Sequence, residues 1–127
     1  MRLRVRTWLV TAALNGALAV ALGAVAAHAL SARLDAHALE LFETGARYHM
    51  YHALALGLAA LAMQTSAART ANWAAWCFFA GIVLFSGSLY LFALTGLQAL
   101  VFVTPLGGVA FLAGWVLLAL AATRIKS

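Results

Sequence analysis

The chain has 127 residues, of which 66% are hydrophobic and only 9% are charged, and its formal net charge is +5. Soluble domains carry roughly 45–50% apolar and about 25% charged residues, and disordered chains are more polar still, so the composition excludes both classes. The basic residues form no stripe interleaved with aromatic residues, so nucleic acid is not an expected partner, whereas the lipid bilayer is.

Four apolar segments are long enough, or nearly long enough, to cross a bilayer as helices. About 20 residues rising ~1.5 Å each cross a hydrocarbon core of roughly 30 Å. The second segment is the shortest and crosses only if its helix begins before Tyr48. We therefore expect an all-α integral membrane protein, a four-transmembrane-helix bundle that forms one domain over residues 1–127. The expected spans are 7–27, 46–64, 73–94 and 104–123.

The first segment also has features of a signal peptide. Arginines precede it, and Ala27, His28 and Ala29 have the small-x-small pattern of a cleavage site. The apolar run is longer than the roughly 7–15 residues of a signal-peptide core, and it contains Asn15, which a packed helix would use. We expect the segment to be a retained first span.

The segment 28–45 is the only long polar stretch, and its pattern predicts a short amphipathic interfacial helix between the first and second spans. Asp35 is placed to cap a helix that begins near Ala36. Glu43 and Arg47 form an i,i+4 pair in the favourable order. Apolar residues at three- and four-residue spacing fall on one face, as is typical of a helix that lies on a membrane surface.

The start of the last span is marked by Thr104 and Pro105. Threonine is a good N-cap, and proline suits the first helical position, where its missing N–H is not needed. The segment 95–103 would then be a turn that dips into the interface, and a re-entrant course stays open. The alternative is a helix that begins at Gln98 and kinks at Pro105.

The basic residues predict the orientation. With four spans, both termini lie on the same side as the loop between the second and third spans. Cytoplasmic loops carry an excess of arginine and lysine, so we expect the N- and C-termini to be cytoplasmic. That side holds Arg2, Arg4, Arg6, Arg69, Arg124 and Lys126, whereas the other side holds Arg33 and Arg47 together with the acidic residues Asp35, Glu40 and Glu43.

Glycine residues recur along the spans. In lipid, helices associate where small residues let their backbones approach closely. We interpret these glycines as packing positions within the bundle or between copies, and the alternative is a ligand pocket that needs glycine for space. The positions are Gly16, Gly23, Gly81, Gly87, Gly107, Gly108 and Gly114.

Asn15 is a lone amide near the centre of the first span. An unpaired amide in hydrocarbon is costly, so we expect it to face Ser86, Ser88, Tyr90 or a backbone carbonyl. A hydrogen-bonded clasp between helices is the favoured interpretation, and a substrate contact is the alternative. A carboxylate at the centre of a span would indicate proton coupling, and none of the four segments has one there.

The histidines gather near the predicted outer face. His49 and His52 are i,i+3 neighbours on one helix, and His28 ends the first span at a similar depth. These three imidazoles are candidate ligands of a metal ion or a haem iron. The alternatives are structural histidines bonded to backbone or to neighbouring side chains, and a pH sensor. The wider candidate ligand-binding set is His28, His52, Tyr48, Asn15, Ser86 and Ser88.

No motif predicts catalysis. The sequence has no glycine-rich phosphate loop after a strand, no nucleophile elbow and no metalloprotease motif. We therefore assign no catalytic residue and expect no enzyme activity, and the cofactor stays unknown.

Four stretches of the chain resemble one family. GAVAAHAL at 23–30 resembles the GAFGAHAL element of the bacterial domain-of-unknown-function 423 family, and YHMYHALAL at 48–56 is similar to its YQMYHALAL element. LFSGSLY at 84–90 and TPLGGV at 104–109, followed by Gly114 and Trp115, are similar to its LFSGSLY and TPIGG…GW elements. Related eukaryotic sequences are named transmembrane protein 256. His28 and His52 match family histidines, whereas His49 stands where the element has glutamine and Ala26 where it has glycine.

The resemblance implies a four-span protein of the bacterial inner membrane without an established biochemical role. The favoured hypothesis is a non-enzymatic structural, accessory or oligomer-forming component, whose partners are copies of itself or a larger membrane complex. The first alternative is a small-molecule binding protein with a site near the outer leaflet for a metal, haem, quinone or lipid. The second is a small oligomeric transporter or channel.

Overall fold

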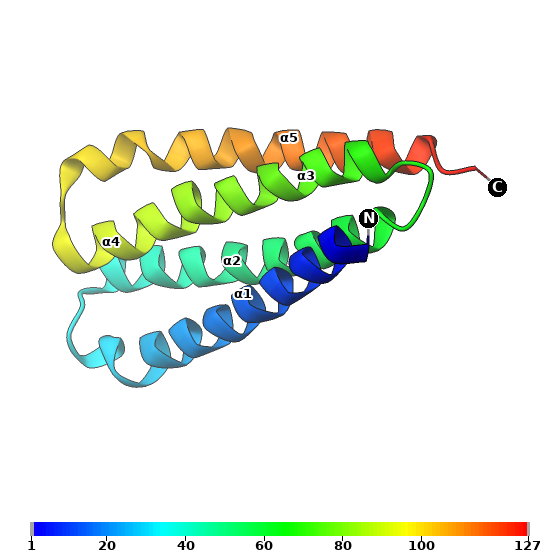
Figure 1. Ribbon diagram of the computed structural model, residues 1–127. Coiled ribbons are helices and arrows are strands. Elements are labelled where there is room, and N and C mark those ends of the chain that lie inside the picture. The colour runs from blue at the N-terminus through cyan, green and yellow to red at the C-terminus, as the bar shows by residue number, and fades with distance from the viewer. Residues whose placement is uncertain (1, 127) are drawn as a thin grey trace.

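The computed structural model describes residues 2–126 and is built from helices that pack lengthwise (Figure 1). The α-helices are α1 (Arg2–His28), α2 (Ala36–Ala62), α3 (Ala68–Gly81), α4 (Gly87–Thr95) and α5 (Thr104–Thr123). The π-helical stretch η2 (Ile82–Ser86) joins α3 to α4 without a break, and short 3₁₀ helices η1 (Leu30–Ala32) and η3 (Gln98–Phe102) lie in two of the connections.

Three of the resulting rods are long and apolar enough to cross a membrane. They are Arg2–Ala32, Ala68–Thr95 and Gln98–Thr123. The predicted all-helical membrane fold is thus confirmed. The helix α2 has 27 residues but does not meet the same hydropathy criterion, because its first half contains charged residues and histidines.

The start of α2 agrees with the prediction, but its extent does not. Asp35 Oδ1 accepts a hydrogen bond of 2.8 Å from the backbone N–H of Ala38, and the helix begins at Ala36. The predicted separate interfacial helix is not formed, because the amphipathic segment continues directly into the second apolar segment as one helix. Phe42 and Gly45 are buried in this first half, where the Phe42 ring packs 4.8 Å from that of Tyr90, so the bundle holds the segment.

The helix α2 lies at the centre of the bundle. It contacts α1 on one side and α3, η2 and α4 on the other, while α5 packs against α3 and η2 (Figure 1). The beginning of α1 and the end of α5 lie at the same end of the bundle. The buried contacts between these helices are rich in alanine, which lets the helix backbones approach closely. Fully buried alanines include Ala55, Ala59, Ala60, Ala71, Ala74 and Ala75.

The glycines of the spans have very different surroundings. A Cβ at Gly107 would overlap the backbone of Phe85, at 2.7 Å from its Cα, and a Cβ at Gly114 would lie 2.6 Å from the Phe78 ring. A Cβ at Gly81 would likewise overlap the ring of Phe111. These three positions bring α5 against the rod formed by α3 and η2. By contrast, Gly87 and Gly108 would gain only ordinary contacts, and a Cβ at Gly16 or Gly23 would meet no atom within 4 Å.

The segment before α5 differs from the predicted turn, because Gln98–Phe102 is helical and leads directly into α5, as in the alternative of a helix that begins at Gln98. Gly96 ends α4 with φ of 70°, a conformation that glycine adopts without strain, and η3 follows. Pro105 lies in the first turn of α5 as expected. Thr104 is not the N-cap: it is the first helical residue, and its hydroxyl lies 2.6 Å from Ser88 Oγ. Because η3 leads directly into α5, backbone carbonyls accept from the first N–H groups, including that of Val103 for Leu106.

Candidate functional site

The polar centre of the bundle is formed by His49 and His52, which α2 presents to different neighbours. Residues three apart on an α-helix differ by about 60° in direction, so the two rings diverge. Both side chains are buried, with 2% and 3% of their surface exposed. His49 lines a groove beside α1 and α4, and His52 lines a different groove beside α5.

His49 joins three helices. Its Nε2 lies 2.8 Å from Asn15 Oδ1 on α1, and its Nδ1 lies 2.9 Å from the Tyr90 hydroxyl on α4. The Asn15 amide nitrogen donates to the Thr11 carbonyl at 2.8 Å, which directs the amide oxygen toward the imidazole. His49 Nε2–H therefore donates to Asn15, and Nδ1 accepts from the Tyr90 hydroxyl. A neutral imidazole satisfies both bonds and leaves neither ring nitrogen free.

His52 is held equally tightly on the other side. Its Nδ1–H donates to the Tyr48 carbonyl at 2.7 Å, and its Nε2 accepts from the Trp115 indole N–H at 3.1 Å. The ring stacks on Phe111 with a centroid separation of 3.5 Å and an interplanar angle of 7°. The hydrogen bond and the stacking together attach α2 to α5, in a region where apolar contacts alone would not fix the register.

The two grooves open between helices. The groove beside His49 has a volume of about 450 Å³, and the groove beside His52 has a volume of about 600 Å³. The first is lined by residues that include Asn15, Leu18, Leu22, Ile82, Val83, Ser88 and Tyr90. The second is lined by residues that include Tyr48, Tyr51, Leu54, Leu58, Phe85, Gly108, Phe111 and Trp115. Both are mostly apolar, so an occupant would be an apolar chain or ring.

The three histidines predicted to converge are not brought together. His28 ends α1 as an exposed residue, while His49 and His52 use their nitrogens for helix contacts. Among residues 2–126, no group of three His, Cys, Asp or Glu side chains has a metal-binding arrangement. The i,i+3 spacing places both side chains on one helix, but it also directs them to different partners.

The two serines of the continuous helix α3–η2–α4 have opposite surroundings. Ser88 Oγ donates to the Phe85 carbonyl at 2.9 Å and contacts the Thr104 hydroxyl. Ser86 is fully buried at the end of η2, and within the described part of the chain its hydroxyl has no hydrogen-bond partner. Neither serine bonds to Asn15, although Ser88 lines the same groove. A π-helical turn of this kind often marks a functional position, because it redirects the side chains that follow.

Replacing the two serines is expected to have opposite effects. Ser86→Ala removes a buried hydroxyl without a partner, so the free energy of unfolding should stay constant or rise by up to about 1 kcal/mol. Ser88→Ala should lower it by about 1 kcal/mol, because the hydrogen bonds of Ser88 with the Phe85 carbonyl and the Thr104 hydroxyl are lost. Unfolding in mixed detergent, followed by circular dichroism, measures both. A larger loss from Ser86→Ala than from Ser88→Ala would contradict this assignment.

Sequence reasoning missed several partners in this polar centre. Asn15 does pair with a backbone carbonyl, that of Thr11, which is one of the predicted partners, but the sequence does not predict its contact with His49. The aromatic partners of His52, Phe111 and Trp115, lie about 60 residues away in the chain. One signal for them was available: a histidine on an apolar helix needs a partner for each ring nitrogen, and Trp115 carries an indole donor in the middle of a span.

Comparisons with known proteins agree with the motif resemblance. The model of the family described as Protein of unknown function (DUF423) matches residues 22–108. The chain belongs to this family. The matched region contains His49, His52 and Tyr90 but not Asn15 or Trp115, so two side chains that bond to the histidines lie outside it. No solved structure gives a significant match.

Relatives of this DUF423 member cover nearly its whole length. The UPF0382 membrane protein YwdK of Bacillus subtilis is 44% identical over 120 residues, which is 94% of this chain and 98% of the relative. The UPF0382 inner membrane protein YgdD of Escherichia coli K12 is 45% identical over 121 residues, which is 95% of this chain and 92% of the relative. The UPF0382 membrane protein SAB0533 of Staphylococcus aureus is 41% identical over 116 residues, or 91% and 94%. The chain is thus a small membrane protein, and these names give no enzyme activity.

Proposed function

We propose that the chain spans the bilayer four times, with α2 as the inner span. The outward face of α2 changes character along its length. The exposed residues of the first half include His37, Glu40, Glu43 and Arg47, and those of the second half are Tyr51, Leu54, Leu58 and Leu61. The change after Arg47 is what a helix requires when it enters hydrocarbon from the headgroup layer. The low hydropathy of α2 is compatible with a span because its two histidines are bonded within the bundle, His49 to α1 and α4 and His52 to α5.

The four-span arrangement predicts which loops share a side of the membrane. In a Cys77→Ser background, we introduce Ser31→Cys, Gln64→Cys or Gln98→Cys, each at an exposed position. A membrane-impermeant maleimide added to intact spheroplasts should label positions 31 and 98. Position 64 should react only after the membrane is opened, because the termini and the loop after α2 are proposed to be cytoplasmic. Labelling of positions 31 and 64 from the same side would show that α2 does not cross.

Within this topology, we propose a non-enzymatic structural or accessory role. The observation that carries the proposal is the use of all four ring nitrogens of His49 and His52 in bonds within the bundle. Side chains committed in this way bind helices together and offer no lone pair or proton to a substrate. The polar groups of the centre are therefore explained by assembly of the bundle, and the outer surface is left to make the contacts on which function depends.

The outer surface of α1 supports association with another membrane helix. Ala12, Ala19 and Ala26 of α1 are buried. Gly16 and Gly23 flank this buried row and have open space around them, and Gly23 borders a depression of about 330 Å³ beside Ala46 and Met50 of α2. Small residues at such spacing let a second helix approach closely. The proposed partner is a second copy of the chain or a component of a larger membrane complex.

If association occurs through this surface, a substitution there should give a variant that folds but remains monomeric. Gly16→Leu should leave the free energy of unfolding within about 1 kcal/mol, since no atom lies near the added side chain. The same change should abolish the oligomer or complex, as measured by cross-linking and by light scattering of the purified protein. Leu14→Ala is the control for an exposed position on the same helix. A wild-type chain that is monomeric, with nothing attached, would refute the proposal.

A further inference from the structure

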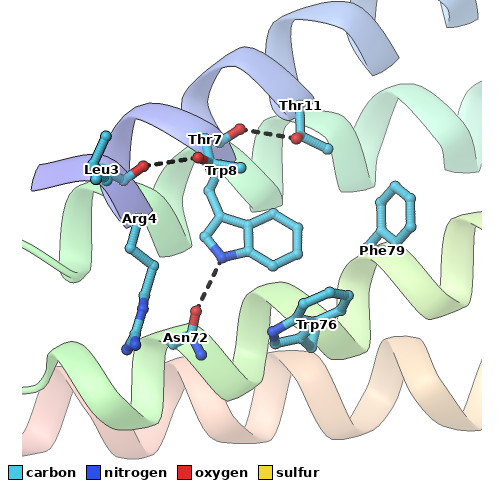
Figure 2. A pocket seen from close by; sticks show the side chains of 8 residues that line it. All are labelled: Leu3, Arg4, Thr7, Trp8, Thr11, Asn72, Trp76 and Phe79. Carbon is cyan, nitrogen blue, oxygen red and sulfur yellow. Dashed lines mark hydrogen bonds between the residues drawn. The ribbon is translucent and has the colours of Figure 1, made fainter. Parts of the chain in front are cut away.

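A groove at the N-terminal end of the bundle separates α1 from α3, with a volume of about 560 Å³ (Figure 2). The groove beside His52 is also aromatic, but this one adds a charged side chain and an amide, both at its mouth, to its aromatic walls. Four of its residues come from the first turns of α1, and the others come from the next turn of α1 and from α3. The lining residues are Leu3, Arg4, Thr7, Trp8, Thr11, Asn72, Trp76 and Phe79.

The orientation of the Asn72 amide is determined by its neighbour. The Trp8 indole Nε1–H donates to Asn72 Oδ1 at 3.0 Å, and an indole nitrogen can only donate. The amide oxygen therefore faces Trp8, and the amide nitrogen with its two N–H groups faces away. In Figure 2, Arg4 extends from α1 to the same end of the groove. Within residues 2–126, neither the Asn72 amide nitrogen nor the Arg4 guanidinium has a hydrogen-bond acceptor.

The free polar groups at this mouth are therefore hydrogen-bond donors. The hydroxyls of Thr7 and Thr11 already donate to carbonyls of their own helix, at 2.8 Å each. The arginine adds a full positive charge in a fork that suits phosphate oxygens. No acidic residue lies at this end, because Asp35, Glu40 and Glu43 all lie at the other end of the bundle. The group that complements this mouth is an anion.

Behind the mouth, the groove provides an apolar path along the bundle. The Trp8 ring packs edge-on against Trp76 at 5.0 Å and lies 6.2 Å from Phe79. Phe79 also lines the groove beside His49, so this ring borders both grooves. The groove beside His49 continues between α1 and the continuous helix α3–η2–α4, past Leu18, Leu22 and Val83. An elongated apolar chain fits this path, whereas a compact anion would fill only its entrance.

We propose that this groove binds an anionic phospholipid. Its phosphate is held by the Arg4 guanidinium and the Asn72 amide N–H groups, and one acyl chain lies along Trp8, Trp76 and Phe79 toward the groove beside His49. Basic pockets between membrane helices recognise anionic headgroups by the same combination of charge and hydrogen bonding. The proposal requires only that the chain lies in a membrane and does not depend on the role or the number of spans proposed above.

The test compares lipid retention by the full-length protein. Purified protein in mild detergent is titrated with phosphatidylglycerol or phosphatidylcholine of the same acyl chains, and bound lipid is counted by native mass spectrometry. Wild type should retain phosphatidylglycerol about tenfold more tightly. Asn72→Asp should abolish the preference, because it keeps an acceptor for Trp8 but replaces the donors with a negative charge. Arg4→Gln should reduce it about fivefold.

Matched variants separate this site from general charge attraction. Arg6→Gln removes the same charge from the same helix, but Arg6 lines a different groove, so the preference should be retained. Thr11→Phe should fill the apolar path and reduce retention of both lipids, with the helical circular dichroism unchanged. Equal retention of the two lipids by wild type, or equal losses in Arg4→Gln and Arg6→Gln, would overturn the proposal. Displacement of the lipid by excess inorganic phosphate alone would overturn the assigned acyl-chain path.

Discussion

Replacing Gly107 with alanine is expected to lower the free energy of unfolding by about 3 kcal/mol. The added methyl group would overlap the backbone of Phe85 in η2, at 2.7 Å from its Cα. A side chain can turn away from such an overlap, but a helix backbone cannot, so α5 would have to move as a whole. Inserting one carbon into a tightly packed contact costs about 1–3 kcal/mol, and a backbone contact lies at the upper end of that range. Unfolding in mixed detergent, followed by circular dichroism, measures the change.

The next residue is the control. A Cβ at Gly108 would lie 4.0 Å from the nearest atom, in the Phe85 ring, which is ordinary contact. Gly108→Ala should therefore leave stability unchanged or raise it by up to about 1 kcal/mol, because alanine favours the helix over glycine. Equal effects of the two substitutions would show that α5 does not approach η2 as closely as the structure indicates.

Replacing His49 with leucine is expected to cost about 2 kcal/mol, whereas glutamine should cost less than about 1 kcal/mol. Leucine leaves Asn15 Oδ1 and the Tyr90 hydroxyl without their partner, and unpaired buried polar groups cost about 1–3 kcal/mol. Hydrogen bonds between membrane helices are often worth only about 0.6 kcal/mol each, which limits the total. Glutamine can donate to Asn15 through its nitrogen and accept from Tyr90 through its oxygen, as the neutral imidazole does.

The same experiment tests whether a histidine is needed at this position for its own chemistry. His37→Leu is the control, since His37 is an exposed residue of the same helix, and it should change stability by less than about 0.5 kcal/mol. If His49→Gln destabilised the protein as much as His49→Leu, the donor–acceptor interpretation would be wrong.

Features with a local cause could be predicted from the sequence. Asp35 caps α2 because a short acceptor side chain precedes a helical pattern, and Pro105 lies in the first turn of α5 because it needs no N–H partner there. The apolar segments were located by length and hydropathy for the same reason. These properties depend on neighbouring residues, so one sequence contains enough information to find them.

Features that depend on distant residues could not be predicted. The pattern of residues 36–47 has the helical period whether it lies on a membrane or within a bundle, and the contact of Phe42 with Tyr90 decides between the two. Gly107 and Gly108 are adjacent and identical, yet only one faces a backbone. The partners of His49 and His52 depend on which helices lie beside α2. For the candidate site, the sequence therefore identified the polar side chains but not their arrangement.

The π-helical stretch η2 changes the direction in which side chains point along the continuous helix α3–η2–α4. A π turn accommodates one residue more than an α turn, and one residue corresponds to about 100° of rotation. Side chains after Ser86 are therefore displaced around the axis relative to an uninterrupted helix that starts at Ala68. Gly81, before η2, faces α5, whereas Tyr90, after η2, faces α2. The extra residue of the π turn thus lets one continuous helix pack against two neighbours, α5 and α2, that have different registers.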